Sequence, residues 1–429
     1  MTPEIEKRIK AVQAGRIPAG YKKTKVGIVP KEWDVQSFGE ISFKTGRKKK
    51  KEEDYPVYSI NNQKGFCSQA EQFENDGYAN TSKDSYTLVG KDTFAYNPAR
   101  INIGSIGLLK EPDKVIISSL YVCFGLNKNC NLSFFESYFK SHRFNYDVSN
   151  YTEGSVRQYL FYDNFSKINV AIPPLSEQKK IAEILATQDR VIELKEKLIA
   201  EKQSQKKYLM SVLLGDDFKK PFKLNGVTID KKKWEKKRIE DVAIMSSGST
   251  PRRDSKDNFC GNILWLSSGE LKQKYICDTE EKISDKAAKE SNLRVYPEGT
   301  FVIAMYGLEA AGIRGTASII KAKSTISQAC MAFTDLNNIT NEFLYYWYLY
   351  NGQIIGSKYA QGSKQQNLNS DLMGKIQINL PSLPEQKAIA DVLSAADEEI
   401  SLLQKDLEQE KLKKKSLMQL LLTGLVRVA

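Results

Sequence analysis

The strongest constraint on this chain is a ten-residue phrase that occurs twice. Residues 173–182 read PPLSEQKKIA and residues 381–390 read PSLPEQKAIA, an offset of 208. The register holds without a gap over residues 135–214, and about 18 of the 42 positions from 173 to 214 are identical in the second copy. Two copies at this spacing indicate duplication of a whole domain and exclude a short-period solenoid.

Upstream of the phrase the two copies are less similar. Residues 28–46 resemble residues 228–248 around Trp33 and Trp234, and 90–96 resemble 297–304. The chain is therefore one unit of about 200 residues written twice, in which each copy has a variable front and a well-matched back.

The front of each copy mixes short apolar runs with turn residues, which predicts an α+β globular domain. Helices are expected at 133–146 and 341–352. Strands are expected at 55–66, 93–97, 114–126 and 166–172 in the first copy, and at 262–268, 299–306, 315–320 and 375–380 in the second.

The back of each copy predicts a helix of about 38 residues, because apolar residues recur at alternating steps of three and four. The prolines at 173, 174 and 381 end the preceding strand, and Gly215 and Gly424 stand where the helices should stop. A helix with a narrow apolar stripe needs a partner. An antiparallel coiled coil between the two helices, with a pseudo-twofold axis, is one solution; packing of each helix on its own domain is the other.

Composition narrows the class of protein. The 429 residues are 41% hydrophobic and carry a net charge of +12, which favours a polyanionic partner, nucleic acid first and an anionic membrane surface second. The N-terminus has no apolar signal region, no stretch is apolar enough to span a bilayer, and the six cysteines form no C-x-x-C pair. These features predict a cytoplasmic protein with reduced thiols.

At this point the chain resembles a specificity (S) subunit of a type I restriction-modification system. The resemblance rests on the paired P-x-L-x-E-Q-K-x-I-A motif, on WEKKRIEDVAIMSSGSTP at 234–251, and on LLLTGLVRV at 420–428. It implies two target recognition domains that each read half of a split DNA sequence. It also implies an antiparallel coiled coil that sets their spacing and docks two methyltransferase (M) subunits, to which restriction (R) subunits are added.

This resemblance gives four segments. Residues 1–172 would hold an N-terminal segment and the first recognition domain, 173–218 the central spacer helix, 219–380 the second recognition domain, and 381–429 the C-terminal spacer helix. The first domain departs from the family's pattern, with FKTGRKKKKEEDYP where the second has MSSGSTPRRDS. Partner contacts are expected at eight helix residues: Glu177, Gln178, Lys179, Ile181, Glu385, Gln386, Lys387 and Ile389.

No catalytic signature is present. The single histidine, His142, excludes two-histidine metal sites, and neither a G-x-S-x-G elbow nor a phosphate-binding G-x-x-x-x-G-K-[ST] loop occurs. Asn97-Pro98 lacks the Asn-Pro-Pro-aromatic quartet of an amino-methyltransferase. We therefore expect no catalytic residue, no cofactor and no metal in this chain, and assign nucleotide, methyl donor and magnesium to partner subunits.

DNA contacts are expected from cationic and amide side chains in loops, because cations position phosphates while arginine and amides read base edges. The alternative for the lysine run is a solvated face. An aromatic run at 345–348 is mostly core, with base stacking as its alternative. The candidates are Arg47, Lys48, Lys49, Lys50, Lys51, Arg157 and Gln158 in the first copy, and Arg252, Arg253, Lys364, Gln365 and Gln366 in the second.

Two other classes of function compete with this interpretation. A plain coiled-coil scaffold would not need two divergent heads with cationic loops. An enzyme that carried its own nuclease or methyltransferase would need the motifs that are missing here.

Overall fold

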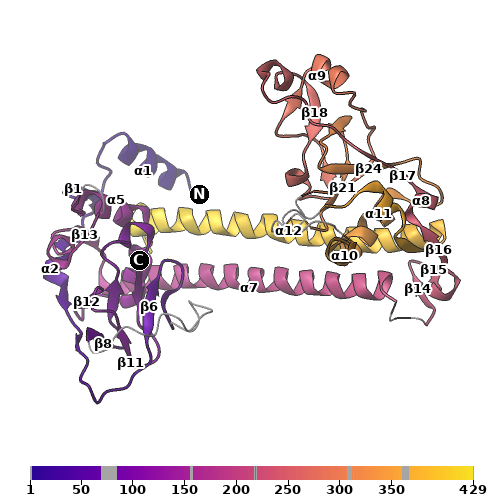
Figure 1. Cartoon of the computed structure of the whole chain (residues 1–429). Helices are drawn as coiled ribbons and strands as arrows, with labels where there is room; N and C mark the ends of the chain where they lie inside the picture. Colours follow the sequence, from indigo (N-terminus) through magenta and orange to yellow (C-terminus); the bar gives the residue numbers. More distant parts are fainter. Residues whose placement is uncertain are drawn as a thin grey trace. The chain divides into compact units, whose positions relative to one another are not determined.

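The computed structural model describes residues 2–68, 85–154, 158–216, 218, 220–306, 312, 314–359 and 367–428. The chain divides into two compact units, Met1–Glu196 with Lys405–Ala429, and Lys197–Gln404. The two longest helices, α7 (Leu175–Leu214) and α12 (Leu383–Leu422), are continuous and have 40 residues each (Figure 1). Each unit therefore contains a globular part and one half of each long helix, and the predicted α+β class is confirmed.

Unit 1 opens with a short helix, continues mainly as short strands, and has the short helices α4, α5 and α6 before its last strand. Its main sheet has the order β10-β9-β12-β4, and a second sheet has the order β11-β8-β5. Its elements before α7 are α1 (Pro3–Gln13), β1 (Tyr21–Thr24), β2 (Gly27–Pro30), β3 (Asp34–Ser37), α2 (Phe38–Ile41), β4 (Ser42–Lys44), β5 (Arg47–Lys48), β6 (Tyr58–Asn61), β7 (Gly65–Ser68), β8 (Thr87–Gly90), β9 (Phe94–Tyr96), η3 (Ile101–Ile103), β10 (Ile106–Leu108), β11 (Lys114–Ile117), β12 (Val122–Leu126), α4 (Leu132–Tyr138), α5 (His142–Tyr151), α6 (Tyr162–Phe165) and β13 (Asn169–Ile172).

The major core of unit 1 joins the globular part to both long helices. A cluster of aromatic rings fills it, with Phe38 stacked on Phe165 at 4.6 Å between ring centroids. Ile181 and Leu185 from the start of α7 belong to the same core, as do Leu421 and Leu422 from the end of α12. Burial of these apolar side chains is what ties the helix ends to the domain.

A smaller core lies under the sheet β11-β8-β5. It contains Val89, Val115 and Ile117, all fully buried, and it includes no residue of α7 or α12. The strands β8 and β11 lie away from the long helices in unit 1 (Figure 1). We call the part built on this smaller core the distal lobe of unit 1.

Unit 2 repeats the plan with a larger sheet. Its main sheet has the order β17-β24-β21-β22-β19, and a second sheet has the order β20-β18-β23. Its elements before α12 are β14 (Phe222–Leu224), β15 (Val227–Ile229), η4 (Lys231–Lys233), β16 (Glu235–Arg238), α8 (Ile239–Val242), β17 (Ile244–Ser247), η5 (Lys256–Phe259), β18 (Ile263–Leu266), η6 (Ser268–Glu270), β19 (Tyr275–Ile276), β20 (Lys282–Ile283), α9 (Asp285–Glu290), β21 (Phe301–Ala304), β22 (Ala317–Ile320), β23 (Ser324–Ile326), β24 (Cys330–Thr334), α10 (Asn341–Tyr359), α11 (Ser370–Gly374) and β25 (Gln377–Leu380).

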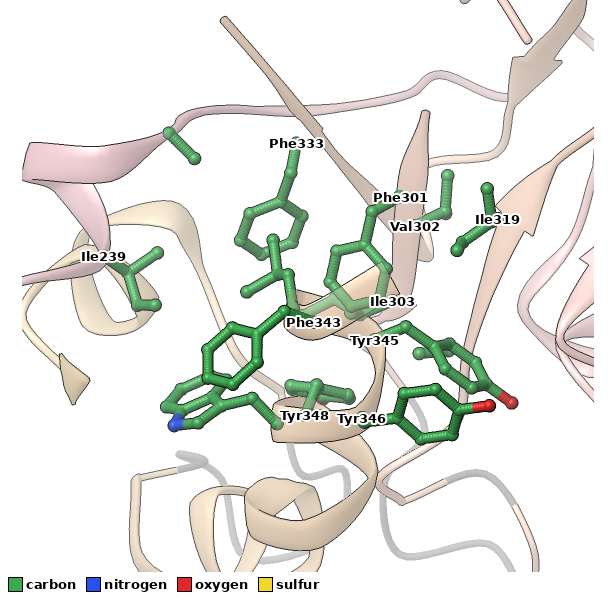
Figure 2. Close-up of a cluster of buried hydrophobic side chains, with 14 of the residues drawn as sticks. Ile239, Phe301, Val302, Ile303, Ile319, Phe333, Phe343, Tyr345, Tyr346 and Tyr348 are labelled. Carbon is green, nitrogen blue, oxygen red and sulfur yellow. The ribbon is translucent and has the colours of Figure 1, made fainter. Parts of the chain in front are cut away.

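The major core of unit 2 packs the main sheet against α10. Phe301 and Phe333 of the sheet lie beside Phe343 of the helix (Figure 2). Met210 and Leu213 from the end of α7 belong to this core, together with residues from the start of α12. Unit 2 thus holds the end of one long helix and the start of the other, as unit 1 does.

Unit 2 also has a distal lobe with its own small core. Trp265, Ile283, Ala287 and Ala288 form this core, with Phe259 packed against it. The elements β18 and α9 of this lobe lie away from α12 within the unit (Figure 1). In both units, therefore, one core holds the long helices and a second core supports a lobe that is free of them.

The long helices pair antiparallel within each unit. In unit 1, Lys414 of α12 forms an ion pair with Asp189 of α7. In unit 2, the equivalent pair joins Lys206 to Asp397. Both alternatives for the helices hold at once, because each helix packs on its own domain and on the other helix.

Some predicted boundaries are wrong. The strand expected at 114–126 is two strands, β11 and β12, separated by a turn in which the Tyr121 N–H donates to the Ser118 carbonyl. The helix expected at 133–146 is α4 followed by α5, because Ser141 caps a new helix by accepting from the Phe144 N–H at 3.2 Å. Serine favours helix starts over helix interiors, and this signal was available in the sequence.

Candidate functional site

The repeated motif lies where each globular part meets its long helix. In unit 1, β3 pairs antiparallel with β13 so that Asp34 stands opposite Ile172. This pairing brings Trp33 next to the first turn of α7, where its indole Nε1 donates to Glu177 Oε2 at 3.0 Å. Both side chains are almost fully buried.

Unit 2 builds the same junction with its own residues. The pairing of β16 with β25 sets Glu235 opposite Leu380. Trp234 then donates from Nε1 to Glu385 Oε1 at 3.1 Å. The tryptophan that begins each domain is therefore bound to the glutamate that begins the following helix, about 140 to 150 residues later.

The glutamine beside each glutamate is also satisfied internally. Gln178 accepts from the Asn131 N–H at 2.8 Å and donates to the carbonyl of the proline five residues before it at 2.9 Å. Gln386 repeats both bonds, accepting from the Thr340 N–H at 2.9 Å and donating to its own preceding proline at 2.9 Å. A buried amide with both ends bonded fixes the position of a helix start on its domain.

These contacts revise the expected role of the motif. Six of the eight predicted partner-contact residues are buried inside their own unit: Glu177, Gln178, Ile181, Glu385, Gln386 and Ile389. Lys179 and Lys387 are exposed, and Lys387 forms an ion pair with Asp391 at 2.9 Å. The motif therefore holds the start of the helix to its own domain, and of the eight predicted residues only Lys179 and Lys387 are exposed.

The charge on each buried glutamate is balanced differently. In unit 1, Arg427 donates from Nε to Glu177 Oε1 at 2.7 Å and from Nη1 to Glu32 at 2.8 Å. The hydrogen bonds that Arg427 donates to these two carboxylates, that to Glu177 first, raise the pKa of Arg427. The last residues of the chain are thus bound back onto unit 1, where the Tyr21 hydroxyl also donates to the Gly424 carbonyl at 2.6 Å.

In unit 2, Glu385 accepts from the backbone of its own helix start instead. Ser382 donates to Glu385 Oε2 from its N–H at 3.0 Å and from its hydroxyl at 2.7 Å. Burial raises the pKa of Glu385, but hydrogen bonds from Ser382, Asp230 and Trp234 outweigh burial, so the pKa is lowered overall. The equivalent of Ser382 in the first copy is Pro174, which has no N–H to donate.

The predicted DNA-contact residues from Arg47 to Lys50 lie on the distal lobe of unit 1. Arg47 and Lys48 form the edge strand β5 of the sheet β11-β8-β5 and are exposed, as is Lys50, while Lys49 is half-buried. Arg47 is not free, because it donates from Nη1 and Nη2 to the two carboxylate oxygens of Glu53. This hydrogen bond lowers the pKa of Glu53 to about 2.

A hollow of about 510 Å³ lies beside Arg47, lined both by the distal lobe and by residues that pack on the major core, among them Val122 and Tyr162. Cationic side chains and aromatic rings line it together, and Lys44 lies over the Tyr162 ring at 5.0 Å from its centroid. Among the lining residues are Lys48, Tyr121 and Phe161. Arginine, lysine and exposed rings together are the groups that contact phosphates and unstacked bases.

In unit 2 the candidates Arg252 and Arg253 lie on the distal lobe as well. Arg253 donates to Glu281 from Nη1 at 2.9 Å and from Nη2 at 2.8 Å. Its guanidinium also lies over the Phe259 ring at 4.9 Å and over the Trp265 ring at 5.5 Å. Arg252 is exposed, and its carbonyl accepts from the Asn258 amide at 2.9 Å.

Several candidates lie outside the described residues: Arg157, Lys364, Gln365 and Gln366. Gln158 is described and exposed. The sequence interpretation missed the two carboxylates, Glu53 and Glu281, that pair with predicted DNA-contact arginines. An acidic residue six positions after Arg47 was a visible signal for the first pair, whereas Glu281 reaches Arg253 only through the fold.

The aromatic run at 345–348 belongs to the core. Tyr346 and Tyr348 are fully buried in α10, and Tyr345 and Trp347 are each 6% exposed. Figure 2 shows Tyr345, Tyr346 and Tyr348 packed beside the main sheet of unit 2. Base stacking by these rings is therefore not available in this structure.

The described residues also bear on two other kinds of site, for metal ions and for membranes. No cluster of histidine, cysteine, aspartate and glutamate side chains suited to a metal ion occurs there. Within the same residues, no helix combines the length and the apolar character that crossing a membrane requires. His142 is exposed at the start of α5, in keeping with a structural or surface role.

Comparison with known proteins agrees with this architecture. A family model described as the type I restriction modification DNA specificity domain matches residues 30–202 and again residues 231–412. The specificity subunit of type I restriction enzyme MjaVIII from Methanocaldococcus jannaschii is 26% identical over 93% of this chain and 94% of its own length. The MjaIX specificity subunit from the same organism is 31% identical over 39% of this chain, and that match spans 38% of the relative.

Solved structures share the fold at low sequence identity. A chain from a study of assembly and conformational transition in the type I R-M system aligns with a TM-score of 0.64, at 14% identity, over 93% of this chain and 99% of that one. The type I restriction-modification S subunit from M. genitalium aligns with a TM-score of 0.54, also at 14% identity, over 91% of this chain and 96% of that one.

Proposed function

Because this chain belongs to the type I restriction-modification DNA specificity family, as a specificity subunit with two recognition domains, we propose that each domain reads one half of a bipartite sequence in double-stranded DNA. The single observation that carries the proposal is the repeated plan of the two units. Each unit fastens its major core to the long helices and presents arginines on a distal lobe that is free of them. A rigid attachment combined with a separate cationic lobe is what a reading head needs.

Arginine on these lobes suits the reading of DNA. Its planar fork matches both a phosphate and the O6 and N7 edge of guanine. Arg47, Arg252 and Arg253 supply such forks, and the net charge of +12 supplies a general attraction to the phosphate backbone.

We assign no catalytic step to this chain. Methyl transfer would reside in two methyltransferase subunits, and cleavage in restriction subunits where they join. In the cytoplasm the complex would thus take its sequence preference from this chain and its chemistry from the partners.

The exposed faces of α7 and α12 are the surface we propose for the methyltransferase subunits. Within the repeat, Leu194 and its equivalent Leu402 are both leucine and are 49% and 66% exposed. Packing inside their own units does not account for an apolar side chain kept on the surface in both copies. A partner that meets the two copies in the same way does account for it.

This docking surface has a direct test. The double variant Leu194→Glu/Leu402→Glu should fold normally but fail to co-purify with the methyltransferase subunit, because two charges would be buried in the apolar contact. Leu120→Glu, at a leucine that is 78% exposed on the globular part of unit 1, is the matched control and should co-purify normally. Retention of the partner by the double variant would count against this surface.

The reading role is tested by exchanging one domain. Residues 219–380 would be replaced by the matching domain of a family member with a known target, and methylated sites would be mapped in cells that also express the methyltransferase subunit. One half of the methylated sequence should change and the other should stay. A change in both halves, or in neither, would contradict separate readers.

A further inference from the structure

Each distal lobe holds one of its exposed arginines in a two-pronged ion pair with a carboxylate of the same lobe. In unit 1 the pair is Arg47 with Glu53. In unit 2 it is Arg253 with Glu281. The two pairs arise differently, since Glu53 lies in the loop that directly follows the strand of Arg47, while Glu281 is brought to Arg253 by the fold.

We propose that Glu53 and Glu281 are specificity-determining residues, each of which occupies its arginine until the O6 and N7 edge of a guanine in the correct half-site displaces it. This inference rests on the proposed reading of DNA by the two lobes. It goes beyond that role because it assigns acidic residues a function in rejecting DNA of the wrong sequence.

The geometry makes the carboxylate a direct competitor of DNA. A carboxylate, a phosphate and the guanine edge all accept two parallel N–H bonds from one guanidinium. While the carboxylate holds both prongs, the arginine cannot grip a phosphate with the same fork. The negative charge also repels the phosphate backbone close to the loop.

The two ion pairs are weak enough for a DNA group to replace the carboxylate on the arginine. The Arg47 and Glu53 side chains are 50% and 20% exposed, and those of Arg253 and Glu281 are 58% and 40% exposed. Ion pairs at such exposure contribute little to stability, because water and salt screen them. A bidentate contact with guanine in a closed groove is stronger than such a pair, whereas a single solvated phosphate offers no clear gain over it.

In each pair, one member is held in place by further contacts. Glu53 accepts a third hydrogen bond, from the Lys50 N–H at 3.0 Å. In unit 2 the arginine itself is fixed, because its guanidinium rests on the Phe259 and Trp265 rings. The Trp265 indole is in turn anchored by donating to the Ser249 carbonyl at 3.0 Å. A group fixed in this way loses little conformational entropy on binding.

The test uses the full chain assembled with its methyltransferase subunits. Glu53→Gln and Glu281→Gln would each be titrated with a labelled duplex of random sequence and with a duplex that carries the mapped target. Each variant should bind random DNA severalfold more tightly. Its loss of affinity between 50 and 200 mM salt should become about 3.5-fold larger, as expected for one additional phosphate contact. Binding to the target should change less, so discrimination should fall.

Two sets of controls make the result specific. Glu298→Gln and Glu111→Gln change the net charge equally, at carboxylates paired with Lys321 and Lys91. They should leave discrimination as it is. The double variants Glu281→Gln/Arg253→Ala and Glu53→Gln/Arg47→Ala should lose the gain, because the released arginine is absent.

The proposal is overturned if the glutamine variants bind random DNA as the unaltered chain does. It is also overturned if the charge controls gain as much affinity, or if the gain survives removal of the arginine. Failure of the underlying function looks different: the unaltered assembly would then bind target and random duplexes equally.

Discussion

At the residue scale, the repeated glutamate joins the domain to the long helix, although the residues beside it in sequence are typical of an exposed helix surface. Glu177 accepts hydrogen bonds from Trp33 and Arg427, which lie near opposite ends of the chain, and only 4% of its side chain is exposed. Removing one partner of a buried ion pair leaves the other unpaired, which costs more than the pair itself contributes. One side chain therefore joins the domain, the helix start and the C-terminal residues of unit 1.

Glu177→Gln should lower the free energy of unfolding by about 2 kcal/mol, a value reduced from that of a fully buried pair because Arg427 remains partly hydrated. Urea denaturation of the full chain measures the loss. Glu193→Gln, at an exposed glutamate paired with Arg190 on the same helix, is the control and should stay within about 0.5 kcal/mol. A loss below that limit for Glu177→Gln would show that the junction does not depend on its charge.

Acid should weaken the corresponding junction in unit 2. The pKa of Glu385 is lowered in the folded state, because hydrogen bonds outweigh the effect of burial. The carboxylate therefore contributes stability above its unfolded pKa of about 4.3, and that contribution is lost as the pH falls through the folded value. The stability difference between the unaltered chain and Glu385→Gln should shrink between about pH 5 and pH 3. Thermal unfolding across this range measures it, and a constant difference would contradict the assignment.

At the element scale, ion pairs join the two long helices to each other. Lys195 pairs with Asp406 in unit 1, and Lys202 pairs with Glu399 in unit 2 at 2.6 Å. Such pairs contribute little stability individually, but they favour the antiparallel register over others. The helices can therefore be changed in length while their ends remain fastened to the domains by the buried motif.

We expect helix length to set the spacing of the two half-sites. One heptad would be inserted between Glu196 and Lys197 of α7 and another between Gln404 and Lys405 of α12, where the two compact units divide. Seven residues add about 10 Å of helix and preserve the seam. At about 3.4 Å per base pair this corresponds to roughly three base pairs.

Sequencing of methylated DNA from cells with the insertions provides the measurement. The half-sites should remain and the spacer between them should lengthen. Insertion into α7 alone is the control, and it should disturb the pairing of the two helices. An active double insertion with an unchanged spacer would remove the helices as the determinant of distance.

At the scale of the whole molecule, the two units share one plan but differ in how they complete it. Unit 1 closes its junction with Arg427, far along the chain, and unit 2 closes its junction with the local Ser382. Unit 1 is assembled from two segments of the chain and unit 2 from one central segment. Both units contain part of α7 and part of α12. Two lobes with exposed arginines on one basic chain predict a binding mode dominated by phosphate contacts.

Affinity of the methyltransferase assembly for its target should therefore fall steeply with salt. Six to ten phosphate contacts imply a loss of roughly 10³- to 10⁵-fold between 50 and 200 mM. Fluorescence anisotropy at a series of salt concentrations gives the slope. Affinity that hardly changes over this range would contradict the proposed interface.

The sequence by itself determined the duplication, the two long helices and the α+β class. Each of these follows from a pattern that can be counted. The patterns are an offset of 208 residues between the copies, apolar positions at alternating steps of three and four residues, and short apolar runs bounded by turn residues. The cationic segments around Arg47 and Arg253 and the absence of recognisable catalytic motifs were also visible in the sequence. The placement of these arginines on distal lobes was not, because the lobes are defined by cores that form only in the folded chain.

Only the tertiary structure decided what the repeated motif does. Glu177 and Gln178 look like surface residues in the first turn of a helix, and their burial depends on Trp33, Asn131 and Arg427, all distant in sequence. The pairing of Glu281 with Arg253 is hidden for the same reason. Helical periodicity reports which side chains share a face of one element, whereas a buried charge needs partners from other elements, and only the folded chain brings those partners within hydrogen-bonding distance.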